Sequence, residues 1–249
     1  MRKKLSTTVV RSGEDIRRAF DAAAHTYQEQ HGNPRRLLHY RVKLIRKAAD
    51  IQPTDTLLDI GCGTGGHLFA LAESFGRGVG IDFSEEMIRV AQENLALHPR
   101  KEKITFQVDE AEKLHIIADN SIDVAMCVGA FEHMLQKRET LRTIHRVLKP
   151  GGRLVMLTPN GNYLWYTTLA PRFQIPTKHY STDQFLTEKE LVTLLQDSGF
   201  KNFSLKNWTF IPKGDIPAVF SILLQFLDVL GKITRWEILR GGWLVKAVK

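Results

Sequence analysis

The sequence predicts an α/β fold in which a doubly wound, mostly parallel sheet of seven strands carries helices on both faces. Two observations support this prediction. Between residues 57 and 157, short apolar segments alternate with segments of helical length, which is typical of parallel sheets joined by crossover helices. The chain of 249 residues, 43% of them hydrophobic, is long enough to bury a large core without disulfides or structural metals.

Residues 1–52 are expected to form a basic, helical lid region ahead of the sheet. Apolar residues recur at three- and four-residue spacing over residues 14–30 and 36–51, which predicts two helices separated by a Gly-Asn-Pro turn. Residues 1–50 contain 12 Lys and Arg against 5 Asp and Glu, so they carry +7 of the net charge of +8. Such a patch can attract nucleic acid, anionic lipid or a phosphorylated substrate, and a solvated helix face explains it equally well.

Residues 53–249 are expected to form the main domain, in which strands and helices follow in regular order. Strands are predicted at 57–60, 78–82, 104–108, 122–128, 153–157, 203–210 and 243–248. Helices are predicted between them at 65–75, 84–98, 138–148 and 187–198. Ser84 is expected to cap the second of these helices, because its side chain can accept from the free N–H groups of the first turn.

Two segments interrupt this order and are expected to lie on the substrate side. Residues 160–183 are rich in aromatic residues and proline, and a connection of this length is more often functional than a spacer. Residues 213–242 include a run that is apolar around most of a helix, which predicts either a lid buried over the sheet edge or a surface placed against lipid. The candidate substrate-binding residues are Tyr163, Trp165, Tyr166, His179 and Tyr180.

The first predicted strand ends in the glycine-rich turn Gly61-Cys62-Gly63-Thr64-Gly65-Gly66, and a helix follows it. Glycines permit positive φ and the close approach of a ligand, and the free N–H groups of a helix start favour polar or anionic groups. The turn fits both G-x-G-x-x-G and G-x-G-x-G patterns, and Asp82, about 20 residues on, suits a ribose-binding acid. The turn alone therefore predicts a Rossmann-like nucleotide site and leaves NAD and S-adenosylmethionine (SAM) open.

Four motifs in order resemble those of the class I SAM-dependent methyltransferases. The segment 59–65, Asp-Ile-Gly-Cys-Gly-Thr-Gly, resembles the first motif of that family, and 80–84, Gly-Ile-Asp-Phe-Ser, resembles the second. Asp109 follows the third strand at the position of the family's adenine-binding acid, and Leu-Lys-Pro-Gly-Gly at 148–152 is similar to the turn before its fifth strand. The resemblance covers residues 57–157 and implies methyl transfer with SAM as the cofactor.

The resemblance also implies which residues contact SAM. Asp82 would bind the ribose hydroxyls, Asp59 would lie near the cationic amino-acid end, and Asp109 would contact the adenine, although Asp59 and Asp109 suit loop capping as well. Tyr27, in a segment that looks like the family's F-D-x-x-A-x-x-Y lid helix, would close over the cofactor or pack in the core. The other expected cofactor contacts are Arg36, Gly61, Gly63, Gly65, Phe83, Met87, Glu110, Ala111 and Val128.

The residues after the fourth strand are expected to face the transferred methyl group. Glu132-His133 resembles the E-H pair of the ubiquinone-biosynthesis O-methyltransferases, and residues 33–37, Asn-Pro-Arg-Arg-Leu, look like their N-P-x-R-L segment. Gly129 stands where the first glutamate of their metal-binding cluster belongs, so no metal site is expected. A hydroxyl acceptor needs a base, and histidine titrates near neutral pH, so His133 is the candidate base and Glu132 the residue that orients it. A helix cap or a wall of the site is the plainer interpretation of His133.

Together these patterns predict a SAM-dependent methyltransferase that modifies a small, apolar or amphiphilic molecule such as a quinone, lipid or phenol, most simply at oxygen. The sequence has neither the Asn/Asp-Pro-Pro-aromatic motif nor the double-glutamate loop that would favour N-methylation of amides, bases or arginine. An NAD-dependent oxidoreductase and a non-catalytic SAM-binding protein are the alternatives.

Composition also limits the setting in which the chain works. The two cysteines, Cys62 and Cys127, match no disulfide framework or zinc spacing, and no uninterrupted apolar run approaches the length that crosses a bilayer. We therefore expect a cytoplasmic protein with a small-molecule substrate, peripheral contact with membranes at most, and no nucleic-acid partner. The sequence leaves the oligomeric state open.

Overall fold

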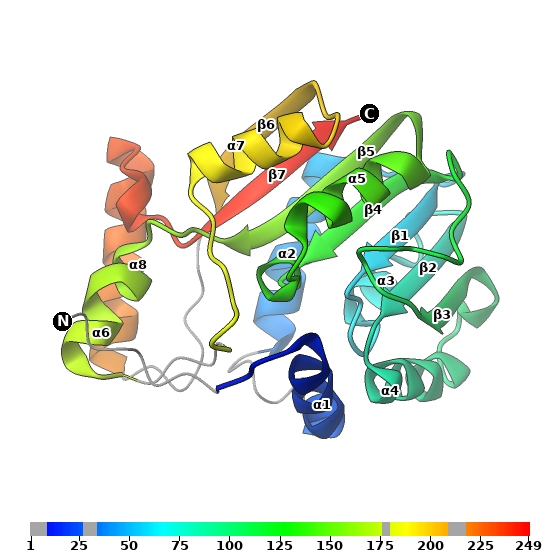
Figure 1. The fold of residues 1–249 in the computed structure, drawn as a ribbon, viewed down its shortest axis with the longest axis horizontal. Helices are drawn as coiled ribbons and strands as arrows, with labels where there is room; N and C mark the ends of the chain where they lie inside the picture. Colours follow the sequence, from blue (N-terminus) through cyan, green and yellow to red (C-terminus); the bar gives the residue numbers. More distant parts are fainter. Residues whose placement is uncertain (1–8, 27–33, 176–179, 209–217) are drawn as a thin grey trace.

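The computed structural model describes residues 9–26, 34–175, 180–208 and 218–249, and in them it contains the predicted sheet (Figure 1). Its seven strands are β1 (Thr56–Ile60), β2 (Arg77–Asp82), β3 (Ile104–Val108), β4 (Ile122–Val128), β5 (Leu148–Pro159), β6 (Asn202–Trp208) and β7 (Gly242–Val248). Their order across the sheet is β3-β2-β1-β4-β5-β7-β6. Strands β1 to β5 are parallel, and β7 runs antiparallel to both β5 and β6.

Helices cover both faces of this sheet, as predicted (Figure 1). The α-helices are α1 (Gly13–Ala23), α2 (Pro34–Ala49), α3 (Gly66–Leu71), α4 (Glu85–Ala96), α5 (Lys137–Val147), α6 (Ala170–Phe173), α7 (Glu188–Asp197) and α8 (Ala218–Thr234). Short 3-10 turns are η1 (Ala24–Thr26), η3 (Lys101–Lys103), η4 (Phe131–His133) and η6 (Glu237–Leu239), and η5 (Trp165–Leu169) is π-helical.

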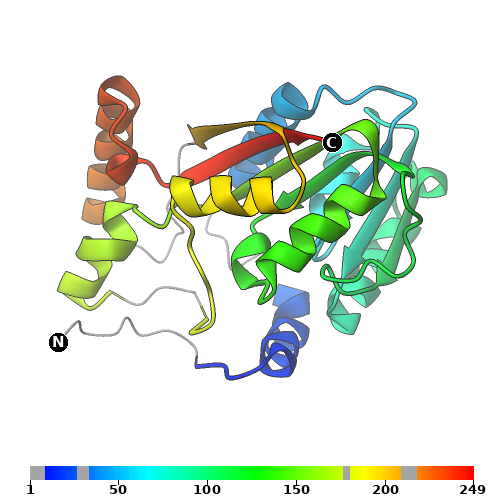
Figure 2. The ribbon, with the colours of Figure 1, turned by 45° about the horizontal axis from the view of Figure 1, so that its top comes forward.

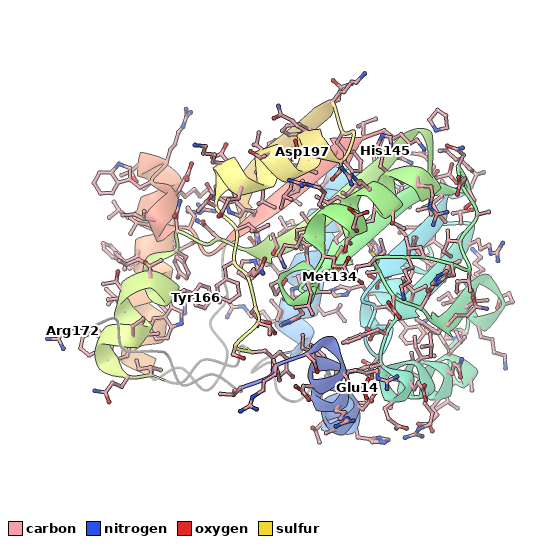
Figure 3. All side chains as sticks on the ribbon, viewed as in Figure 1. Glu14, Met134, His145, Tyr166, Arg172 and Asp197 are labelled. Carbon is pink, nitrogen blue, oxygen red and sulfur yellow. The ribbon has the colours of Figure 1, made fainter. Side chains whose placement is uncertain are left out.

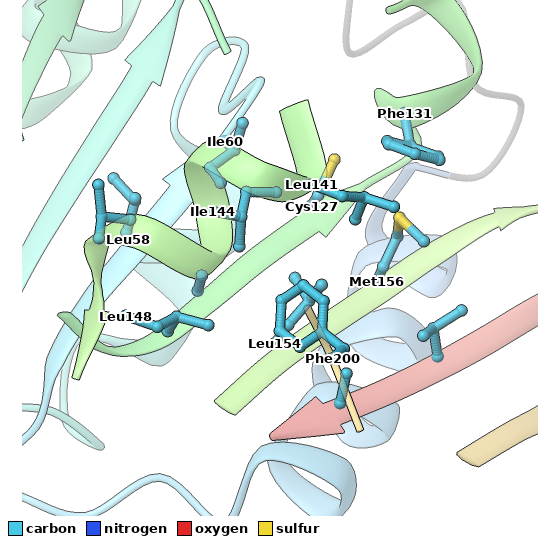
Figure 4. Close-up of a cluster of buried hydrophobic side chains, with 14 of the residues drawn as sticks. Leu58, Ile60, Cys127, Phe131, Leu141, Ile144, Leu148, Leu154, Met156 and Phe200 are labelled. Carbon is cyan, nitrogen blue, oxygen red and sulfur yellow. The ribbon is translucent and has the colours of Figure 1, made fainter. Parts of the chain in front are cut away.

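The core lies in two layers because the strands point alternate side chains to opposite faces. In β4, Ala125 and Cys127 pack against α5 and α7, whereas Val124 and Met126 pack against the layer that contains α2, α3 and α4. Figure 4 shows the first layer, in which Ile144 from α5 and Phe200 after α7 lie over β4 and β5. Helix α2, expected in the lid region, therefore belongs to the core.

The order of the strands positions the functional site. The chain builds β1, β2 and β3 outward on one side and then crosses to β4, which lies on the other side of β1. The segments after β1 and β4 consequently lead away from each other at the carboxyl ends of these strands. In open α/β sheets a ligand binds in the crevice formed at this point.

Several predicted elements have different ends in the structure. Strand β5 extends to Pro159 because it pairs along its length with β7, from Arg153–Val248 to Pro159–Gly242. The first helix ends at Ala23 and continues only as η1, and the remainder of the predicted helix lies outside the described residues. Ser84 caps α4 as predicted, since its Oγ accepts from the N–H of Met87 at 3.1 Å.

The two interrupting segments pack against each other at one end of the molecule (Figures 1 and 2). Five buried residues, from the turn before η5 and from η5, α6 and α8, form a separate cluster: Tyr163, Trp165, Tyr166, Ala170 and Leu224. In the described part of the chain, no helix combines the length and the apolar character needed to cross a bilayer.

Candidate active site

A cavity of about 570 Å³ opens at the carboxyl ends of β1, β2, β3 and β4. Its volume lies in the usual range of small-molecule sites. Four stretches of chain line it: the turn after β1, the end of β2 with the start of α4, the segment after β3, and the segment after β4. Helix α1 closes the side that would otherwise face solvent. The cavity thus forms at the point where the strand order reverses between β1 and β4.

The glycine turn brings bare backbone to the cavity wall. Gly61 and Gly63 line the cavity with φ of +69° and +52°, values that side-chain-bearing residues rarely adopt. A Cβ on Gly61 would lie 2.5 Å from the Cβ of Ala130, which is too close for any side chain. Gly65, expected to contact the cofactor, is buried against Phe106 and does not line the cavity.

Asp82 ends β2 and turns its carboxylate toward the glycine turn. Its Oδ2 accepts from the N–H of Gly63 at 2.9 Å, and its Oδ1 accepts from the N–H of Ser84 at 3.0 Å. Burial raises the pKa of Asp82 to about 6, against the opposing effect of these hydrogen bonds. The carboxylate therefore fixes the turn relative to β2 and still lines the cavity.

Asp59, in β1 just before the turn, is buried, and neither of its carboxylate oxygens has a hydrogen-bond partner among the described residues. Burial, and next the nearby Asp82, raise its pKa to about 8. A buried carboxylate without a donor is costly, and an adjacent cation or donor would remove that cost. Asp59 does not itself line the cavity, so it would act on a cationic ligand from behind the turn.

The segment after β3 forms the far end of the cavity. Val108, Asp109, Glu110 and Ala111 line it together with Phe83 and Met87 at the start of α4. Asp109 accepts from the N–H of Glu110 at 2.8 Å and from that of Ile116 at 3.2 Å. Its carboxylate thus caps its own loop while lining the cavity, and the contact with adenine stays a prediction.

Helix α1 forms one wall of the cavity, and the sequence motifs predicted only part of this contribution. Gly13, Glu14, Ile16, Arg17 and Phe20 line the cavity. Asp21 holds the helix in place, since it accepts from the hydroxyl of Ser84 and from the N–H of Glu86. The Phe20-Asp21 pair at the start of the lid motif was the part of the sequence that indicated a role for this helix at the cofactor site. Tyr27, the expected lid residue, lies outside the described residues.

The turn after β4 is shaped by the buried ammonium of Lys137. Its Nζ donates to the carbonyl oxygens of Phe131 at 2.9 Å, Glu132 at 3.2 Å and Met134 at 2.7 Å. Burial lowers the pKa of this lysine. Three carbonyls on one cation fix the path of η4, and with it the position of His133, which lines the cavity.

His133 is held by Asp183 from a loop fifty residues further along the chain. Its Nδ1 donates to Oδ1 of Asp183 at 2.6 Å, and Oδ2 of Asp183 accepts from the N–H of Tyr180 at 2.9 Å. The rings of Phe20 and Tyr180 lie edge-on to the imidazole, with centroids 5.2 and 5.6 Å away. The expectation that Glu132 provides the orienting carboxylate does not match this geometry, because Glu132 is buried and accepts from the hydroxyl of Thr158 at 3.4 Å.

Other expected residues lie away from the cavity. Arg36 is exposed on α2 and does not line it. Arg41, one and a half turns further along α2, places its Nη2 3.1 Å from the position of a Cβ on Gly129, which is a cavity residue. Val128 is buried behind the wall at the end of β4.

The expected substrate residues are divided between two places. Tyr163, Trp165 and Tyr166 belong to the cluster under α8 and do not line the cavity, although Figure 3 shows Tyr166 on the side of that helix pair nearest the sheet. Tyr180 stands beside His133, and His179 lies outside the described residues. Within the described ranges, no group of three or more His, Cys, Asp or Glu side chains could hold a metal ion.

A family model described as methyltransferase domain matches residues 51–207. Phosphoethanolamine N-methyltransferase 2 of Caenorhabditis elegans is 31% identical over 171 residues, which cover 68% of this chain but only 37% of that longer protein. A demethylmenaquinone methyltransferase of Lactiplantibacillus plantarum is 30% identical over 175 residues, covering 62% of this chain and 73% of the relative. The ubiquinone/menaquinone biosynthesis C-methyltransferase of Geotalea daltonii is 31% identical over 153 residues, covering 58% and 63%.

Solved structures share the fold at low identity. The [4+2]-cyclase SpnF superposes with a TM-score of 0.69 at 17% identity, covering 98% of this chain and 99% of that one. Geranyl diphosphate C-methyltransferase of Streptomyces coelicolor gives 0.61 at 16% identity, covering 86% and 80%. Haemonchus contortus phosphoethanolamine N-methyltransferase 2, crystallised with SAM, gives 0.59 at 18% identity, covering 84% and 51%. A cyclase among these neighbours illustrates that the fold by itself does not determine the reaction.

Proposed function

The chain belongs to the methyltransferase-domain family of SAM-dependent enzymes, and from this premise we propose that it methylates a small, apolar or amphiphilic molecule at oxygen. The single observation that carries the proposal is the Asp183–His133 pair at the cavity wall. It supplies a base where an acceptor hydroxyl would meet the methyl donor. An acceptor of this kind partitions into membranes, so peripheral contact with a membrane surface is part of the same proposal.

The residues around the cavity fit SAM. The backbone of Gly61 and Gly63 leaves room for close approach, and Asp82 is placed to accept from the ribose hydroxyls. The orphaned carboxylate of Asp59 matches the ammonium of the amino-acid end, and the Arg41 guanidinium at Gly129 is the candidate partner of the carboxylate there. When bound, SAM supplies an electrophilic methyl group on a sulfonium.

The catalytic task of the chain is to remove the acceptor proton and to position its oxygen. With Nδ1–H of His133 donating to Asp183, Nε2 is the nitrogen that can take the proton, and the Asp183 carboxylate stabilises the resulting imidazolium. Burial raises the pKa of Tyr180, so this phenol stays protonated at neutral pH and acts as a hydrogen-bond donor rather than a base. Positioning for in-line attack supplies the remainder of the rate.

The wall around His133 favours an apolar acceptor. Phe20, Ile16, Met134 and Leu135 line the cavity on α1 and after β4. Four of the charged lining groups lie at the ends of β2 and β3, and Glu14 and Arg17 lie on α1. Figure 3 shows Met134 at the segment after β4 and Glu14 on α1, the two elements that bound this part of the cavity. An aromatic or prenylated hydroxyl compound suits such a lining.

Relatives described as menaquinone-pathway methyltransferases favour a second candidate, transfer to a ring carbon of a hydroquinone. The same base would then remove a phenolic proton and so raise the electron density at the neighbouring ring carbon, which takes the methyl group as the bond from sulfur to methyl breaks. The proton on that carbon then moves to the phenolic oxygen and restores the aromatic ring. The two candidates share His133 and differ in the product, which is a methyl ether in one case and a ring-methylated hydroquinone in the other.

The test is turnover of a panel of short-chain hydroquinones, catechols and phenols with SAM labelled with ¹³C in its methyl group. The carbon chemical shift of the product separates a methoxyl from a ring methyl. We expect His133→Gln to lower kcat by about a hundredfold or more, with the Kd for SAM unchanged within about twofold. The control is His145→Gln, a histidine on α5 away from the cavity (Figure 3). Equal turnover by wild type and His133→Gln would remove the base from the mechanism.

A further inference from the structure

The outer side of α8 is apolar although it faces solvent. Four residues at helical spacing, Ile222, Phe226, Val229 and Ile233, are 56–75% exposed. Steps of three and four residues place them on one narrow stripe, and the helix is about 25 Å long. Isolated exposed apolar residues are normal on protein surfaces, but a continuous stripe of large ones marks an interaction site.

The buried side of the same helix carries its one acidic residue among apolar ones. Asp228 faces inward and forms an ion pair with Arg240 at 3.4 Å, both side chains being almost fully buried. Leu224 and Gly231 complete this inner side, where Gly231 lies close to Leu239. A helix whose outer side meets only water normally exposes polar side chains there. The ion pair and the apolar contacts of Leu224 hold α8 in the fold, while the outer apolar stripe is left for an outside partner.

The edge of the stripe is cationic. Lys232 and Arg235 are exposed at the end of α8, and Arg172 is exposed on the neighbouring α6, on its outer side (Figure 3). The single acid within α8 is the buried Asp228. Trp236 directly follows the helix and is 59% exposed. Two copies of this surface would bring like charges together, whereas an anionic lipid surface would complement them.

We propose that the α8 face, defined as Ile222, Phe226, Val229, Ile233 and Trp236 with the flanking Lys232 and Arg235, docks on a bilayer that contains anionic lipid. The helix lies in the plane of the interface, with the apolar stripe toward the acyl chains and the cations at the headgroups. Tryptophan prefers this boundary because its ring is apolar and its N–H is polar. The inference rests on the proposed function only for its purpose, which is to bring the enzyme to an acceptor dissolved in the membrane.

Trp236 provides a probe at the proposed contact. Of the four tryptophans, Trp165, Trp208 and Trp243 are buried, so aqueous quenchers such as iodide act mainly on Trp236. The full chain is titrated with vesicles of phosphatidylcholine containing phosphatidylglycerol, and with vesicles of phosphatidylcholine alone, without SAM or acceptor. We expect a blue shift and loss of iodide quenching with the anionic vesicles, both absent in Trp236→Phe.

Substitutions distinguish vesicle binding through the α8 face from non-specific binding by exposed apolar residues elsewhere. Phe226→Ser with Ile233→Ser is expected to weaken binding to anionic vesicles by about tenfold or more. Lys232→Gln with Arg235→Gln is expected to weaken it by about fivefold for each charge and to flatten its salt dependence. Leu97→Ser is the matched control, because Leu97 is 90% exposed at the end of α4. It should bind as wild type does.

Three results would overturn the proposal: no binding to anionic vesicles, equal loss in Leu97→Ser and in the α8 variant, or self-association through α8 that the α8 variant abolishes. Because neither SAM nor acceptor is present, a failure of methyl transfer leaves these results unaffected. If the protein methylates soluble phenols but does not bind vesicles, the proposed function stands and the membrane-docking proposal is wrong.

Discussion

Replacing Asp59 with asparagine tests the electrostatics of the glycine turn most directly. The carboxyl is buried without a hydrogen-bond partner among the described residues, and its pKa is raised to about 8 from an ordinary 3.8. Between these values the native state retains a proton that the unfolded chain has released. The free energy of unfolding therefore falls as the pH rises from about 4 to 8, and the change levels off above that.

The size of this change in the free energy of unfolding follows from the pH interval between the two pKa values. One proton per molecule corresponds to about 1.4 kcal/mol per pH unit, so this group costs about 3 kcal/mol more at pH 7 than at pH 5. An asparagine carries no charge at either pH, and its fixed packing cost cancels in the comparison. Asp82, whose pKa of about 6 lies in the same range, titrates in both proteins and cancels as well.

Urea unfolding of the SAM-free protein at pH 5, 6 and 7, followed by circular dichroism, measures this difference. We expect the Asp59→Asn variant to gain stability relative to wild type by about 1.4 kcal/mol for each unit of rising pH. The same variant should bind SAM at least about tenfold more weakly, since the partner of its ammonium is gone. A stability difference that does not change with pH would refute the assignment of a buried and unpaired Asp59 with a raised pKa.

Three further substitutions test neighbouring parts of the site. Gly61→Ala should abolish SAM binding and lower the free energy of unfolding by about 2 kcal/mol or more, because its Cβ would clash and its φ is +69°; calorimetry and thermal denaturation measure both. Its control, Gly151→Ala, has a φ of +78° with open space around the added atom, so it should lower stability only and leave SAM binding intact. Lys137→Met should cost about 3 kcal/mol and lower kcat, since three carbonyls lose their cation; a variant as stable and active as wild type would contradict its clamping role. Arg41→Gln should raise the Kd for SAM about tenfold while Arg36→Gln leaves it unchanged, and the reverse order in a calorimetric titration would return the role to Arg36.

The sheet and the cofactor turn were accessible from sequence because their determinants are local. A short apolar strand, a run of glycines with positive φ and a capping serine each depend on a few adjacent residues. The glycine turn alone left NAD and SAM open, and the family match decides for SAM. The pairing of His133 with Asp183 could not be read this way, because it depends on how a loop after β5 returns over the end of β4.

The position of Arg36 outside the cavity lining could not be predicted for a related reason. Arg36 and Arg41 lie on one helix and are both arginines, so composition does not distinguish them. Five residues along an α-helix correspond to about 140° of rotation, which places the two side chains on different sides. Only the packing of α2 against the sheet determines that Arg41 reaches Gly129 while Arg36 stays exposed.

The apolar segment near the C-terminus shows that hydrophobic periodicity does not predict which side of a helix is buried. Asp228, one of its few polar residues, is buried, because Arg240 from the turn after α8 meets it inside the fold. Period alone identifies the faces of a helix but not which face is covered. A distant partner charge reverses the usual assignment.

The N-terminal segment connects the cofactor wall to the partner of the proposed base. Helix α1 lines the cavity and is tied to α4 through Asp21, while the residues just before it are tied to the loop that carries Asp183. There Ser181 Oγ accepts from the N–H of Val10 at 2.9 Å and donates to its carbonyl at 2.7 Å. Because Asp183 lies two residues further on and holds His133, displacement of this segment would open the cavity and release the base from its carboxylate together. Helix α1 and the proposed base are therefore tied to the same short segment, and we expect a change in one to affect the other.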